Sequence, residues 1–226
     1  MGFDFKIGKN SMILIYTVSI FAIFLWGISY IWTDRLLDLG IPVFYFVFIR
    51  MIVAGVVLFL LNATSGKIQK VDKKDWPKFF ALAFCEPFVY FLCETYGIEL
   101  TGSPTISAMI IATVPIFSIF AGRILFRERI RKTNIFGMIL SLLGILLVVM
   151  THSETSEHMT LGIILLIIAV ISEVGHASFT KSLSGNYTAQ TITMFQFLIG
   201  SVYLFPLFLY KGLDDFDASF YLSAEV

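Results

Sequence analysis

Long apolar stretches, separated by short polar segments, run along almost the whole chain. A helix rises about 1.5 Å per residue, so roughly 20 apolar residues cross about 30 Å of hydrocarbon. Seven stretches have about this length: residues 12–32, 42–62, 78–98, 103–126, 133–150, 160–181 and 189–210. The pattern predicts an all-α polytopic membrane protein with seven spans.

The composition supports a membrane protein and excludes several other classes. Apolar residues make up 58% of the chain and charged residues 14%, and a soluble domain of this length could not bury that much apolar surface. The sequence contains no phosphate-binding loop, nucleophile elbow or dinucleotide fingerprint. Cys85 and Cys93 are eight residues apart, too far to bridge on one helix, and no metal-ligand spacing occurs. We therefore expect no cofactor, no metal site, no enzymatic activity and no nucleic-acid partner.

The basic residues are distributed unevenly between the two ends of the predicted spans. If the N-terminus is inside, 13 of the 16 Lys and Arg residues lie on inner segments. Arg35 and Lys211 lie outside, and Arg50 lies within a span. Basic residues gather in cytoplasmic loops, so the sequence predicts a multi-pass protein of the cytoplasmic (inner) membrane with a cytoplasmic N-terminus.

A faint internal repeat becomes visible when the chain is shifted against itself by 146 residues. Five crossings separate each residue from its mate, so the second copy is inverted, as in many secondary transporters. We expect a five-span repeat over residues 12–150 and a partial second repeat over 160–226, which ends where an eighth span would begin. Three further C-terminal helices, and no transport by residues 1–226 alone, are then expected. The matched pairs include Arg35 with Lys181, Pro42 with Thr188, and Arg50 with Gln196.

Several motifs in the first five spans have the residue types and spacing of one family: Trp26-Gly27, Pro42 with Arg50 and Ala54, Thr105 to Ala108, Pro115, Glu128, Gly137 and Gly144–Val148. On these residues the chain resembles an EamA domain of the drug/metabolite transporter superfamily. The resemblance implies a carrier of ten helices, in two inverted five-helix repeats around a central cavity, that moves amino acids, drugs, nucleosides or other metabolites. The chain departs from the family at Ser172, where a tryptophan is expected, and in the last three spans.

Two glutamates lie within the third span, where a charge costs roughly 2.5–3.5 kcal/mol. Glu86, Tyr90 and Glu94 are four residues apart, so a continuous helix would place them along one slanting stripe of proton or cation acceptors. Alternatively, one glutamate simply neutralises Arg50, for which a role as a fixed structural counter-ion is the stronger hypothesis.

The sixth span carries Glu173 and, three residues on, His176, which share a helix face. They form either a proton relay or a hydrogen-bonded structural pair. Near mid-membrane, three glutamates then outnumber one arginine, an excess that attracts protons or cationic solutes. Trp26 and Tyr90 could wall a substrate site, although packing is the commoner use, and Pro115 predicts a hinge or a bent helix.

The function predicted from these features is a secondary transporter that moves a small metabolite by alternating access, with proton-coupled export through Glu86 and Glu173. Its partners are a small-molecule substrate, protons and the lipid bilayer. A seven-helix receptor or retinal protein remains an alternative, although it lacks a lysine deep in the last span. An intramembrane enzyme built on Glu86, Glu94 and His176 is a further alternative. The substrate, the direction of transport and the oligomeric state stay open.

Overall fold

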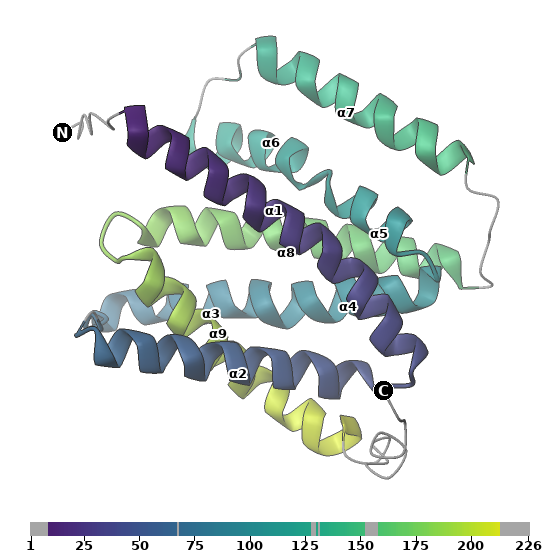
Figure 1. The fold of residues 1–226 in the computed structure, drawn as a ribbon. Coiled ribbons are helices and arrows are strands. Elements are labelled where there is room, and N and C mark those ends of the chain that lie inside the picture. Colours follow the sequence, from purple (N-terminus) through teal and green to yellow (C-terminus); the bar gives the residue numbers. More distant parts are fainter. Residues whose placement is uncertain (1–8, 67, 128–129, 131, 152–157, 213–226) are drawn as a thin grey trace.

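The computed structural model describes residues 9–66, 68–127, 130, 132–151 and 158–212, and the regular structure in these ranges is entirely helical. Figure 1 shows long helices that run roughly along one direction, with connections at both ends. The α-helices are α1 (Lys9–Asp38), α2 (Val43–Thr64), α3 (Trp76–Ala83), α4 (Tyr90–Thr101), α5 (Pro104–Ile111), α6 (Val114–Phe126), α7 (Lys132–Thr151), α8 (Met159–Leu183) and α9 (Ala189–Leu207). Shorter 3₁₀ and π segments are η1 (Lys73–Asp75), η2 (Phe84–Val89) and η3 (Phe208–Gly212).

Helical stretches long and apolar enough to cross a membrane confirm the predicted class of an all-α polytopic membrane protein. Among the described residues there are six: Met12–Asp38, Val43–Thr64, Lys73–Thr101, Pro104–Phe126, Met159–Leu183 and Ala189–Tyr210. The remaining predicted span, 133–150, forms the 20-residue helix α7. Helix α7 packs against α5 at the outer side of the fold and is not one of the six, so its crossing stays a prediction (Figure 1).

Two of the six stretches are interrupted helices. The third joins α3 to α4 through η2, where Glu86 has extended backbone angles (φ −137°, ψ 125°) beside Pro87. The fourth bends between α5 and α6, and Pro115 lies in the first turn of α6, where its missing N–H has no helical partner to lose. A helix boundary thus lies next to Pro115, whereas the break at Glu86 was not anticipated and corrects the expectation of a continuous third helix.

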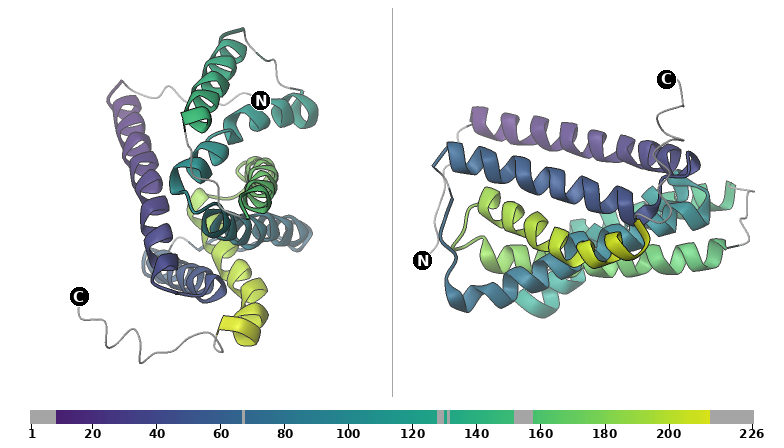
Figure 2. Two further views of the ribbon diagram at one scale, coloured as in Figure 1. Left: turned by 90° about the vertical axis from the view of Figure 1, so that its right-hand side faces the viewer. Right: turned by 90° about the horizontal axis from the view of Figure 1, so that it is seen from below.

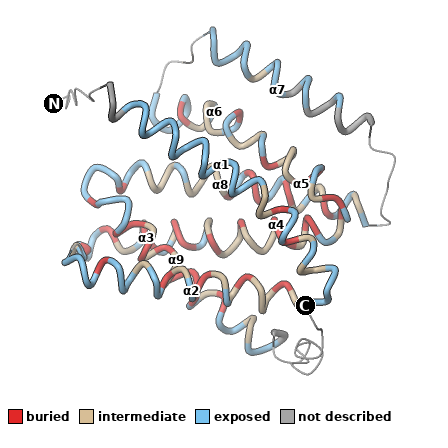
Figure 3. Tube along the Cα trace, in the orientation of Figure 1, coloured by how far each residue is buried: buried red, intermediate tan, exposed pale blue. Residues whose placement is uncertain are grey.

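The core lies where the third stretch packs between α8 and α9, and where α2 packs against α9. Figure 3 shows the buried residues concentrated on α3, α4, α8 and α9, whereas the residues of α1 and α7 whose burial is described are mostly exposed. Small residues allow the closest approach: a Cβ on Gly97 would meet Leu166, and a Cβ on Gly162 would meet Thr101. Such contacts are how helices associate in lipid, where no hydrophobic force drives them together. The views in Figure 2 show this core from its end and from below.

Candidate functional site

The interrupted third span brings Glu86 to a junction of three helices. Because Glu86 leaves the helical conformation, Tyr90 donates its N–H to the Cys85 carbonyl five residues back, as in a π-turn. The Ser172 hydroxyl of α8 donates to the same carbonyl at 2.8 Å. Irregular backbone at membrane depth needs such partners. Ser172, which departs from the family pattern, therefore supports the break.

Two glycines let the neighbouring helices approach the break closely. A Cβ on Gly200 of α9 would overlap the Pro87 ring, and a Cβ on Gly175 of α8 would lie 3.0 Å from the Cys85 Sγ atom. Helices α8 and α9 therefore pack directly on the unwound turn. Any larger residue at position 200 would push α9 away from Glu86.

The side chains that meet at this junction are Glu86, Glu173, His176 and Gln196, which we call the histidine cluster. The His176 Nδ1 atom lies 2.8 Å from the Glu86 Oε2 atom and 3.3 Å from the Glu173 Oε1 atom. On the other side of the ring, Nε2 lies 3.3 Å from the Gln196 Oε1 atom and 3.2 Å from the Thr180 hydroxyl. One imidazole therefore joins the third span to α9 while it contacts two carboxylates.

The histidine cluster borders a cavity of about 200 Å³. Glu86, His176, Thr180, Thr193 and Gln196 supply its polar wall, and Ala189, Ile192 and Phe197 supply its apolar wall. Drug-sized pockets have roughly 300–1,000 Å³, so this cavity is smaller than a typical site for a drug-sized ligand. The Glu86 and His176 side chains are 16% and 17% exposed, so neither is fully enclosed by the helices.

Glu86, Glu173 and His176 each offer an atom of the kind that binds metals, and these atoms lie within 4.8 Å of one another. A hydrogen bond explains the shortest of these distances, because 2.8 Å is typical for an imidazole and a carboxylate. The three side chains are therefore close enough to form one hydrogen-bonded group.

A second group, which we call the tyrosine cluster, holds Glu94. Its Oε1 atom accepts hydrogen bonds from the Tyr30 hydroxyl at 2.6 Å and from the Tyr90 hydroxyl at 2.7 Å. Its Oε2 atom lies 4.0 Å from the Arg50 Nη2 atom. The Arg50 guanidinium also lies over the Phe91 ring, 4.1 Å from its centroid. Glu94 is only 5% exposed, so two hydroxyls and a cation stabilise a carboxylate that has little access to solvent.

The predicted stripe of Glu86, Tyr90 and Glu94 is wrong in one respect. Tyr90 and Glu94 lie one helical turn apart and are joined by a hydrogen bond. Because the helix is broken at Glu86, the Glu86 side chain contacts His176 and does not continue this row. The ion pair of Arg50 forms with Glu94 and not with Glu86, the other glutamate of the third span.

Of the remaining predicted site residues, Glu173 lies beside His176 as its helical spacing indicates. Trp26 is 44% exposed and its ring centroid lies 6.2 Å from that of Tyr30, so its part in a substrate site stays a prediction. Glu128 lies outside the described residues. Sequence reasoning missed Tyr30, Gln196 and Pro87; the pair of Arg50 with Gln196 in the internal repeat pointed to Gln196, and Pro87 follows Glu86 directly.

Comparison with known proteins gives the family. The model of the EamA-like transporter family matches residues 13–150, which is more than half of the chain. The chain belongs to the EamA-like transporter family. The match covers the first predicted repeat, whose motifs carried the resemblance, and the third span with its interrupted helix lies inside it.

This EamA-like protein also resembles curated proteins from an archaeon and a bacterium. An uncharacterized transporter of Archaeoglobus fulgidus is 31% identical over 66% of this chain and 51% of the relative. The uncharacterized transporter YetK of Bacillus subtilis is 29% identical over 79% of this chain and 55% of the relative. The chain thus spans about half the length of these relatives. No solved structure matches it significantly.

Proposed function

We propose that this EamA-like protein takes part in secondary transport of a small solute across the cytoplasmic membrane by alternating access, with proton exchange at the histidine cluster. The observation that carries the proposal is Glu86. This carboxylate leaves its helix at a break inside a predicted span, meets His176 at 2.8 Å and borders a cavity. Discontinuous helices near the bilayer midplane are where secondary transporters bind substrates and coupling ions.

The groups around Glu86 suit proton exchange. From α8, Glu86 faces the titratable groups Glu173 and His176, and from α9 it faces the neutral Gln196. Arg50 of α2 adds a more distant positive charge. Two carboxylates and one imidazole this close together titrate as one coupled group. The loss or gain of one proton therefore changes the charge that all three side chains experience. A solute with a positive group would compete for the same carboxylates.

Alternating access is supported by the internal repeat. The offset of 146 residues carries Val43, the first residue of α2, onto Ala189, the first residue of α9. It also carries Arg50, which contacts Glu94, onto Gln196, which contacts the histidine beside Glu86. Such a relation between two halves provides two similar conformations that open to opposite sides. The similar proteins are named as uncharacterized transporters, which favours this function over a receptor or an intramembrane enzyme.

Metabolite profiling tests the proposal because it detects any small solute whose level the protein changes. Cells that express the full-length gene are compared with cells that express its Glu86→Gln variant, which keeps the size and hydrogen bonding of Glu86 but cannot titrate. We expect one or a few small solutes to change in level with the wild-type protein and not with the variant. Proteoliposomes loaded with a pH-sensitive dye should then report proton movement when that solute is added.

The matched control is Glu99→Gln, which removes an exposed carboxylate of the same span, in α4. It should behave as the wild type. Equal proton movement in wild type and Glu86→Gln would exclude Glu86 as the coupling group, and no solute change with the wild-type protein would contradict transport itself.

A further inference from the structure

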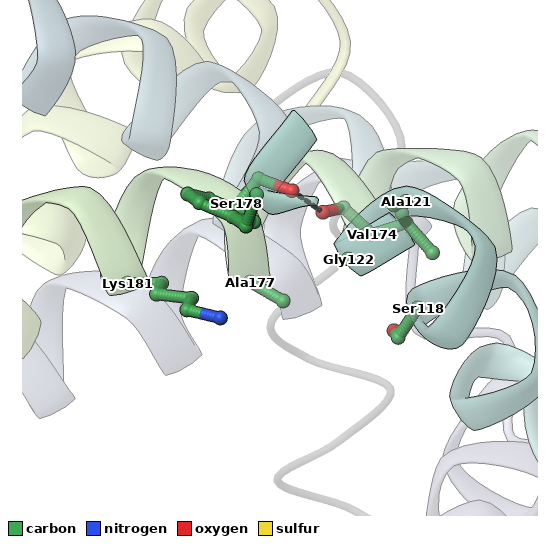
Figure 4. A pocket seen from close by; sticks show the side chains of 8 residues that line it. Ser118, Ala121, Gly122, Val174, Ala177, Ser178 and Lys181 are labelled. Atoms are coloured by element: carbon green, nitrogen blue, oxygen red, sulfur yellow. Dashed lines mark hydrogen bonds between the residues drawn. The ribbon is translucent and has the colours of Figure 1, made fainter. Parts of the chain in front are cut away.

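An elongated groove lies on the surface of the protein between α3, α6 and α8, and it follows α8 from Val174 to Ser182. Two adjoining hollows of about 150 Å³ and 430 Å³ form it, and both include Phe126, Val174 and Ser178. We call it the inner groove, because these helix ends carry the basic segments predicted to be cytoplasmic. Figure 4 shows the smaller hollow, with Ser118 of α6 and Lys181 of α8 on opposite sides.

The floor of the inner groove is apolar, and several of its residues have small side chains or none. Ala121 and Gly122 of α6 and Ala177 of α8 leave room between the helices, and Leu125, Phe126 and Phe179 line the larger hollow. Ser178 uses its hydroxyl within its own helix, on the Val174 carbonyl at 2.8 Å. Such a floor suits a hydrocarbon chain, since it offers van der Waals contact and few groups that need a hydrogen bond.

The rim of the inner groove is basic. Lys78 lines the larger hollow and Lys181 the smaller one, and the Lys181 Nζ atom lies 4.4 Å from the centroid of the Phe126 ring. Two further basic residues follow in sequence close to Phe126: Arg123 lies in the last turn of α6 and Arg127 directly after it, and both are exposed. Among the described residues, the acidic group at this rim is Asp75, whose carboxylate accepts hydrogen bonds from Lys78 at 3.1 Å and from Tyr187 at 3.0 Å. The rim therefore keeps a positive excess.

We propose that the inner groove binds an anionic glycerophospholipid, with an acyl chain on the apolar floor and the phosphate at the basic rim. The charge complementarity selects the headgroup, and the apolar floor selects a lipid over a free phosphate. Basic pockets between membrane helices on the cytoplasmic side are known to take acidic headgroups. The groove shares no lining residue with the cavity at the histidine cluster, so its lipid binding can be measured independently of transport.

Native mass spectrometry of the purified full chain tests the site. The protein is offered phosphatidylglycerol and phosphatidylcholine with identical acyl chains, and the ratio of the two bound lipids is measured. We expect a preference for phosphatidylglycerol that falls about fivefold in Lys181→Gln, the size expected for one basic residue near the membrane surface. Lys78→Gln should lower the ratio as well, because Lys78 lines the larger hollow. Inorganic phosphate should not displace the lipid.

Two further variants keep the test decisive. Lys70→Gln with Lys73→Gln removes two exposed lysines of the same end of the protein that do not line the groove, and it should leave the ratio unchanged. Ala177→Phe fills the groove while every charge stays, and it should reduce the binding of phosphatidylglycerol. An unchanged ratio in Lys181→Gln, an equal loss in the Lys70 and Lys73 control, or displacement by phosphate would overturn the proposal.

Discussion

Tyr30 and His176 contact the two glutamates of the third span, one each. They stand 146 residues apart, the offset of the predicted repeat, and each comes from the first helix of its half. The Tyr30 hydroxyl lies 2.6 Å from Glu94, and the His176 imidazole lies 2.8 Å from Glu86. A phenol at this position keeps its proton at neutral pH, whereas an imidazole exchanges it. The same position in each half therefore places a hydroxyl beside one carboxylate and an imidazole beside the other.

The first prediction concerns Arg50 and Glu94. Arg50→Gln leaves Glu94 without its cation, and we expect it to destabilise the protein by about 2–3 kcal/mol, below the value for a fully buried pair because Arg50 is 29% exposed. The additional change Glu94→Gln should restore most of the lost thermal stability. Unfolding temperatures in detergent measure both effects. Rescue by Glu86→Gln in place of Glu94→Gln would show that the pairing is different.

The second prediction concerns the contact between α9 and the break. Gly200→Ala places a methyl group against the Pro87 ring, so we expect a loss of about 1–3 kcal/mol from overpacking, together with loss of transport. Gly27→Ala is the matched control, because nothing lies within 4 Å of its added Cβ. Thermal unfolding of the two variants should separate them. Equal stability of both would contradict the close approach of α9 to the break.

The spans, the family and the membership of Glu173 with His176 in one group follow from apolar length, motif spacing and helical periodicity. The pairing of Glu86 with His176 could not be predicted, because it needs the backbone to leave the helix at Glu86. Helical periodicity assumes an unbroken helix and therefore predicted that Glu86 and Glu94 lie on the same stripe of the helix surface. Pro87 was the available indication, but a proline alone does not tell which way the preceding side chain turns.

The third prediction separates the two clusters by their response to pH. His176→Gln keeps a polar side chain beside Glu86 but removes the titratable ring, so transport should lose its dependence on pH between about 5 and 8. Tyr30→Phe removes one hydrogen bond to Glu94 and should lower stability by about 1 kcal/mol while the pH profile keeps its shape. Initial transport rates over this pH range give the comparison. A flattened profile in Tyr30→Phe would contradict the division of roles.

The fourth prediction is the topology. Tags at the N-terminus and within residues 63–77 should report the cytoplasm, and a tag within 152–159 should report the opposite side, because most basic residues then lie inside. Residues 152–157 lie outside those that the structure describes, so the accessibility of the tags is the direct measurement. A cytoplasmic tag within 152–159 would contradict both the orientation and the inverted repeat.

The position of His176 has a mechanical consequence. The ring touches Glu86 on one edge and Gln196 of α9 on the other, while its own backbone belongs to α8. Sliding of α9 against α8 would stretch one of these bonds, and addition or loss of a proton would change both. By thermodynamic reciprocity, whatever helix movement makes the proton easier to lose must itself be favoured when the proton has gone. A single side chain can in this way couple the protonation of the histidine cluster to the relative positions of three helices.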